Sequence, residues 1–132
     1  DLGFILIHFN IKRGKIATEY LQEGKKLEKD GDLEAASTIY KQAIALNPKF
    51  SWCYYKLAET LAKQEKYEEA IAHYHQAIEL NPNSALFISN LAEALAQNGD
   101  RERAKLYLEE ISKISLDFPL PEKILSQVYN YK

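Results

Sequence analysis

Apolar residues follow helical spacing across residues 51–84, with polar residues between them. In the first half of this window, apolar side chains recur at i, i+3, i+4 and i+7, which places them on one stripe of a helix. A second stripe of the same kind follows in the second half. The members of the two stripes are Tyr54, Leu57, Ala58 and Leu61, then Ala70, Tyr74, Ala77 and Ile78. Pro82 ends the second helix, because proline lacks a backbone N–H and restricts the residue before it. The window therefore predicts two packed antiparallel helices.

The small and aromatic residues of this window are spaced in a way that resembles the tetratricopeptide repeat, a helix-turn-helix unit of about 34 residues. Ala58 and Ala70 would let the two backbones approach closely, while Tyr54 and Tyr74 fill the space beside that contact. The positions that match the family pattern are Tyr54, Leu57, Ala58, Leu61, Ala70, Tyr74, Ala77 and Pro82. The resemblance implies an all-α fold, a right-handed superhelix of stacked helix pairs.

The windows on either side repeat the pattern. Residues 17–50 align without a gap, at Tyr20, Gly24, Leu27, Ala36, Tyr40, Ala43 and Pro48. This first unit departs at Glu23, where the pattern expects leucine, and a carboxylate there suits a repeat whose outer edge is solvated. Residues 85–118 form a third unit, which keeps Leu91, Ala92, Leu95, Ala104 and Leu108. Its end is degenerate, because Ile111 and Leu116 replace the second alanine and the proline.

The end of the chain predicts a short capping helix. Pro121 suits its first turn, and an apolar stripe follows at Ile124, Leu125 and Val128. A stack of repeats needs such a cap, because each repeat leaves an apolar side exposed to the next. The expected order is a segment outside the repeats over residues 1–16, repeats over 17–50, 51–84 and 85–118, and the cap over 119–132.

The turns between paired helices carry further predictions. Gly31 can take the left-handed conformation that ends a helix, and Asp32 can cap the next helix by accepting from its free N–H groups. At the equivalent turn of the central repeat we expect Glu65 to be left-handed, at a cost of about 1 kcal/mol. Ser51 and Ser84 stand at the entries of the second and third repeats, where a hydroxyl cap is favoured.

Residues 1–16 do not fit the repeat. Their apolar core favours a strand by local preference, with one alternating face made of Ile5, Ile7, Phe9 and Ile11. An all-helical stack offers a strand no partner, and the basic residues follow the apolar run instead of preceding it as in a secretory signal. We expect the segment to pack on the repeats or on a second copy of the chain, the latter giving a homodimer through residues 1–16.

Composition narrows the class of protein. The 132 residues suffice for one domain with a core, and no apolar run approaches the roughly 20 residues of a membrane-spanning helix. A net charge of −2 and a pI near 6.0 argue against nucleic acid as a partner. Cys53 is the only cysteine, so no internal disulfide or cysteine metal cluster is expected, and a cytoplasmic location fits. Because the chain begins at Asp1 and lacks methionine, we expect a region of a longer protein.

A candidate binding surface lies opposite the buried stripe of the first helix in 51–84. At 100° per residue Trp52 and Tyr55 are expected to face away from the helix pair, and such aromatics are frequent binding hot spots. The family resemblance implies that this face of each first helix lines a concave groove for a peptide or partner helix. The residues assigned to this groove are Gln22, Lys25, Lys29, Trp52, Tyr55, Lys56, Glu59, Lys63, Leu86, Ser89, Asn90, Glu93 and Gln97, with Thr18 and Leu21 at equivalent positions. The alternative is that Trp52 packs on a neighbouring first helix and the lysines are only solvated.

Some members of the family hold the C-terminal carboxylates of heat-shock chaperones with a clamp of Lys, Asn and Arg side chains. The matching positions here hold Leu21 and Lys25, then Lys56, then Leu86 and Asn90. The resemblance therefore disfavours a chaperone-tail adaptor, and a looser preference for acidic or mixed peptides stays open.

The chain offers little for catalysis. His73 and His75 are two residues apart on a helix, hence about 200° apart, so they cannot hold one metal together. The sequence also lacks a glycine-rich phosphate loop. It predicts a protein-interaction scaffold without a cofactor or activity of its own. Two alternatives stay open: an appendage of a larger enzyme, such as a glycosyl- or methyltransferase, and an oligomerisation unit.

Overall fold

The computed structural model describes residues 15–129, which form seven helices. Their bounds are α2 Ala17–Lys29, α3 Leu33–Leu46, α4 Ser51–Lys63, α5 Tyr67–Leu80, α6 Ala85–Gln97, α7 Arg101–Ile114 and α8 Glu122–Tyr129. The predicted strand lies within residues 1–14, outside the described residues, and so does most of the segment 1–16 through which a homodimer is predicted. No helix in the described range is both long and apolar enough to cross a bilayer.

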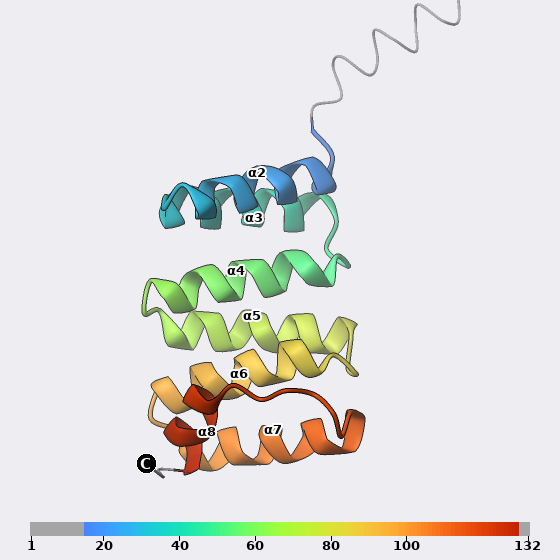
Figure 1. Ribbon diagram of the computed structural model, residues 1–132. Coiled ribbons are helices and arrows are strands. Elements are labelled where there is room, and N and C mark those ends of the chain that lie inside the picture. Colours follow the sequence, from blue (N-terminus) through green and yellow to red (C-terminus); the bar gives the residue numbers. More distant parts are fainter. Residues whose placement is uncertain (1–14, 130–132) are drawn as a thin grey trace, which may run out of the picture.

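Three antiparallel helix pairs stack in chain order, from α2 and α3 to α6 and α7, and α8 packs on the last pair (Figure 1). The first helices of the pairs begin at Ala17, Ser51 and Ala85, which are evenly spaced along the chain. The structure thus has the all-α superhelix and the capping helix that the resemblance implies.

Small residues sit where the paired helices approach each other. Ala36, Ala58 and Ala70 are fully buried, and Tyr40 fills the space beside the first contact. A Cβ atom placed on Gly24 of α2 would lie 2.3 Å from the Tyr40 ring, so only glycine fits there without a shift of the ring. The small-residue pattern of the sequence therefore reflects close backbone packing.

The capping helix closes the apolar end of the stack. Ile124 and Val128 are buried, and α8 contacts both α6 and α7. Pro121 stands directly before the helix, and its carbonyl accepts hydrogen bonds from the N–H groups of Ile124 and Leu125. At the other end of the stack, the Glu23 carboxylate of α2 is partly exposed and pairs with Lys15.

The turn predictions are confirmed at Gly31, where φ is 86°, and at Glu65, where φ is 62°. Asp32 caps α3 by accepting from the Ala35 N–H at 3.1 Å. Ser84 caps α6, but the prediction for Ser51 is wrong, because Ser51 is already the first residue of α4. One repeat length before Ser84 stands Phe50, so the two serines occupy different positions of the repeat.

Candidate functional site

An open hollow of about 440 Å³ lies between the three first helices, α2, α4 and α6. We call it the apolar hollow, because most of its wall comes from aliphatic and aromatic side chains. Its lining residues are Leu21, Lys25, Phe50, Trp52, Tyr55, Lys56, Glu59 and Leu86. The repeat places these residues together because equivalent positions of successive first helices share one face of the stack.

Trp52 is the exposed aromatic of this hollow. It is 45% exposed, and its ring meets the rings of Tyr55 and Phe87 edge to face at centroid distances of 5.4 and 5.2 Å. Phe87 belongs to α6, so Trp52 does pack on a neighbouring first helix, yet about half of its surface stays open. Trp52 therefore packs on a neighbouring first helix, as the alternative interpretation expected, and still has exposed surface in the groove that a ligand could contact.

Tyr55 corrects the prediction that both aromatics face away from the core. It is 5% exposed, and its ring stacks on Phe87 at a centroid distance of 4.8 Å. The helical wheel of α4 considers only its pairing with α5, whereas Phe87 of α6, in the next repeat, also packs on Tyr55 and covers it. The Tyr55 ring thus packs against the Trp52 ring, and only a small part of Tyr55 is exposed in the wall of the hollow.

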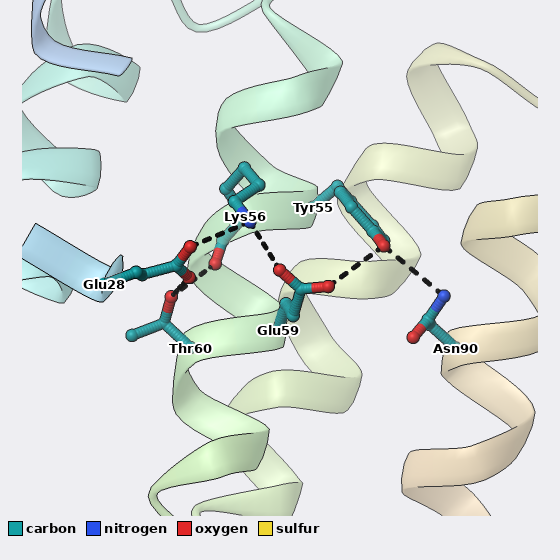
Figure 2. A network of polar contacts seen from close by, with 6 residues as sticks. All are labelled: Glu28, Tyr55, Lys56, Glu59, Thr60 and Asn90. Atoms are coloured by element: carbon teal, nitrogen blue, oxygen red, sulfur yellow. Dashed lines mark hydrogen bonds and ion pairs between the residues drawn. The ribbon is translucent and has the colours of Figure 1, made fainter. Parts of the chain in front are cut away.

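A polar network runs across the floor of the groove from α2 through α4 to α6 (Figure 2). The Lys56 ammonium lies 2.8 Å from the Glu28 carboxylate of α2 and 2.5 Å from the Glu59 carboxylate of its own helix. The Thr60 hydroxyl, which is fully buried, also bonds to Glu28. These contacts tie the first repeat to the second.

The same network continues into the third repeat. The Tyr55 hydroxyl donates to the second oxygen of Glu59 at 3.1 Å and accepts from the Asn90 amide at 3.4 Å. Asn90 also donates to the Leu86 carbonyl at 2.9 Å, which fixes its orientation on α6. Lys56, Glu59 and Tyr55 are therefore held by partners within the chain.

The ion pairs of the network determine the direction in which the pKa values of Glu28 and Lys56 are shifted. Burial alone would raise the pKa of Glu28, but the Lys56 ammonium and the Thr60 hydroxyl outweigh it and hold that pKa below its usual range. Burial alone would lower the pKa of Lys56, and its bonds to Glu28 and Glu59 raise it instead. Both groups are charged at neutral pH, so the pair persists there.

A second hollow of about 370 Å³ continues the groove toward the other end of the first helices. We call it the polar hollow, after its charged and amide residues. Its lining residues are Glu59, Ala62, Lys63, Glu65, Tyr67, Tyr74, Asn90, Glu93, Ala94, Gln97 and Lys123. Lys123 comes from the capping helix and pairs with Glu93 at 3.4 Å. Glu59 lines both hollows and so marks the boundary between them.

The structure brings most of the predicted groove residues into these two hollows. Gln22, Lys29 and Ser89 line neither of them. Ser89 is 3% exposed and donates its hydroxyl to the Leu86 carbonyl at 2.9 Å, so its assignment to the groove wall is wrong. Gln22 and Lys29 are exposed on α2, and their contact with a ligand stays a prediction.

Sequence reasoning missed Glu28, Phe50 and Lys123. Glu28 lies toward the neighbouring repeat, and its pairing with Lys56 depends on how α2 stacks on α4. Phe50 precedes α4 in a loop, where the repeat pattern makes no demand. Lys123 is exposed on the capping helix. The sequence pattern of that helix was interpreted only through its buried apolar residues. The one usable signal was the aromatic character of Phe50 next to Trp52.

Other candidate groups lie away from the groove. His73 stacks on Tyr54 and His75 lies beside Tyr107, so the two imidazoles contact different rings. Cys53 is fully buried, and burial raises its pKa to about 11. Within residues 15–129 no cluster of His, Cys, Asp and Glu side chains has the arrangement of a metal site.

The stacked helix pairs and their shared groove define a helical repeat protein. Sequence profiles described as tetratricopeptide or TPR repeats match residues 20–50, 39–72, 60–99 and 87–118. The matches together span residues 20–118, and the chain belongs to the tetratricopeptide repeat family. No curated protein sequence matches it significantly.

Solved structures of the same fold include peptide complexes. The type III secretion chaperone SycD of Yersinia enterocolitica, in complex with a peptide of the translocator YopD, matches with a TM-score of 0.77 and 18% identity over 86% of this chain and 89% of that one. The first TPR of Spaghetti (RPAP3), bound to the HSP90 peptide SRMEEVD, matches at 0.75 and 18%, over 86% and 90%. The second TPR of Spaghetti, bound to the same peptide, matches at 0.73 and 25%, over 76% and 94%.

Proposed function

We propose that this chain is a protein-interaction module that binds a peptide segment or helix of another protein in the groove across α2, α4 and α6. The observation that carries the proposal is Trp52, which is anchored by Tyr55 and Phe87 yet 45% exposed at the edge of the apolar hollow. A rigid aromatic beside an open apolar hollow can bury a ligand side chain at little cost in conformational entropy.

The size and composition of the apolar hollow suit one large apolar side chain. Leu86 of α6 lines the same hollow and is 38% exposed, so an apolar ligand group in the hollow would cover both Leu86 and Trp52. Burial of one such group stabilises a complex by about 1.5–3 kcal/mol. The polar hollow beside it offers amide and charged groups that can orient the backbone of a bound segment.

The related folds add support at the level of architecture, because SycD and the first TPR of Spaghetti were solved with bound peptides. The proposal assigns no reaction to the groove. The hollows combine an exposed apolar side chain with amide and charged groups, which suits recognition of a peptide segment.

The test is selection of peptides from a random library against the purified protein, followed by calorimetric affinity measurements on variants. Trp52→Ala should weaken the selected peptides by roughly thirtyfold, the loss expected for a hot spot. Leu106→Ala is the matched control, because Leu106 is 60% exposed on α7, away from the groove. It should leave the affinity within about twofold. Equal losses in the two variants, with unchanged helical circular dichroism, would place binding outside the groove.

A further inference from the structure

The first helix of the stack exposes apolar positions that its counterparts bury. Tyr54 and Leu61 of α4 are 9% and 1% exposed. The equivalent residues of α2, Tyr20 and Leu27, are only partly buried. Ile16, which stands one turn before Tyr20, is 47% exposed. The same positions of the repeat are thus covered in α4 and incompletely covered in α2.

The order of the stack explains this difference. The second helix of each repeat packs on the first helix of the next, so α3 lies against α4 and α5 lies against α6 (Figure 1). Within residues 15–129, α2 is the first helix of the stack and has no such neighbour. We call the stripe formed by Ile16, Tyr20, Glu23 and Leu27 the outer face of α2. A stack of repeats needs a cover at such an end, because its apolar side is otherwise exposed.

The chain that enters α2 lies beside this outer face. The Lys15 ammonium pairs with the Glu23 carboxylate and lies 5.6 Å from the centre of the Tyr20 ring. The Lys15 side chain is itself 51% exposed, so it does not close the face. The residues before Lys15 therefore start next to the surface that needs a cover.

The segment before Lys15 has the composition of a cover. Residues 4–11 include no Asp, Glu, Lys or Arg, and their apolar members are Phe4, Ile5, Leu6, Ile7, Phe9 and Ile11. This run ends shortly before α2, as α3 ends at Leu46 shortly before α4. It thus stands in front of α2 at the place in the chain that α3 takes in front of α4. Contact between the run and the outer face would remove apolar surface of both from water.

We propose that residues 4–11 of this chain pack on the outer face of its own α2 and close the first end of the stack, as α8 closes the last. Lys15 favours this position over the groove, because its contacts with Tyr20 and Glu23 hold the chain at the outer face. None of the four outer-face residues lines either hollow, so the groove stays open for a ligand. The inference is therefore independent of the proposed function.

Photo-crosslinking in the full chain locates the segment. With benzoylphenylalanine in place of Ile7, cross-links mapped by mass spectrometry should reach Leu27 and its neighbours, and the product should keep the mass of one chain. Leu106→benzoylphenylalanine is the control, because Leu106 is 60% exposed on α7, and it should give no cross-link to α2. A product with the mass of two chains would overturn the proposal in favour of a second copy. Cross-links to Trp52, or cross-links confined to residues 12–18, would also overturn it.

Urea unfolding of the full chain provides a second readout. Serine in place of Ile5, Ile7 and Phe9 together should lower the urea midpoint by about 0.5–1.5 M, because the outer face loses its apolar cover. The matched control replaces three exposed leucines by serine and should shift the midpoint by less than about 0.3 M. These leucines are Leu46, Leu80 and Leu106, which are 54%, 41% and 60% exposed. Equal midpoints for the two triple variants would show that residues 4–11 do not cover the stack.

Discussion

Replacing Glu28 by glutamine should loosen the junction between the first and second repeats, because this carboxylate joins α2 to α4. Glu28 is 8% exposed and pairs with Lys56, which is 17% exposed. Breaking a fully buried pair costs about 3–5 kcal/mol. Lys56 keeps Glu59, and a glutamine oxygen can still accept from Thr60, so we expect a loss of about 1–3 kcal/mol in the free energy of unfolding.

The effect of Glu28→Gln has a defined pH dependence. The pKa of Glu28 in the folded chain is below its ordinary value of 4.5, so its contribution is complete above that value and is lost as pH falls through the folded pKa. The pKa of Lys56 is raised above 10.5, so its share is present below 10.5 and is lost as pH rises through the folded value. The stability gap between wild type and variant should be widest between these limits.

Urea unfolding followed by circular dichroism and by the fluorescence of Trp52, the single tryptophan, measures this gap. Glu102→Gln is the matched control, because Glu102 is 87% exposed and pairs with Lys105 at 3.6 Å. It should cost less than about 0.5 kcal/mol. If Glu28→Gln lowers the free energy of unfolding no more than this control does, the ion pair does not stabilise the repeat junction. The same conclusion follows if the stability difference between wild type and Glu28→Gln does not shrink at acidic pH.

Three further predictions concern local structure. Glu65→Gly should stabilise the protein by up to about 1 kcal/mol, because φ at Glu65 is 62°, whereas Gln64→Gly at φ −85° should destabilise it by a similar amount. Gly24→Ala should cost about 1–3 kcal/mol in urea unfolding, since its methyl group overlaps the Tyr40 ring. Cys53, whose pKa burial raises to about 11, should react with iodoacetamide roughly a hundredfold more slowly in the folded chain than in urea, as followed by mass spectrometry.

Each of these predictions has a clear contrary result. A lower urea midpoint for Glu65→Gly would contradict the strained turn. Unchanged stability of Gly24→Ala would mean that Tyr40 moves away at little cost. Equal alkylation rates of Cys53 in the folded and unfolded chain would show that the thiol is accessible.

Most of the fold could be predicted because the repeat pattern is local. Alanine, tyrosine and proline spacing specifies the first two helix pairs, and the third pair keeps Ala92, Leu95, Ala104 and Leu108 of the same pattern. The turns followed from glycine and aspartate chemistry, and Glu65 from its equivalence to Gly31. Ser51 was misplaced by one position, because a serine near a helix entry suggests a cap without fixing the first helical residue.

The site was less accessible to prediction than the fold. Trp52 was identified from its place on the helix, and its half-exposed state needed the position of Phe87. Tyr55 and Ser89 were assigned to the groove and are buried. The periodicity of one helix gives the direction of each side chain, but it does not say which neighbouring helix covers it.

The sequence by itself determined the helix pairs and their order, because these depend on spacing along the chain, and the family resemblance supplied the face on which a groove is expected. Only the tertiary structure decided which groove residues are free to bind. Lys56 is paired because Glu28 of the preceding repeat lies 2.8 Å away, whereas Lys25 and Lys63 have no ion-pair partner in residues 15–129. Burial and pairing depend on contacts between repeats, and those contacts are made by residues far apart in the sequence.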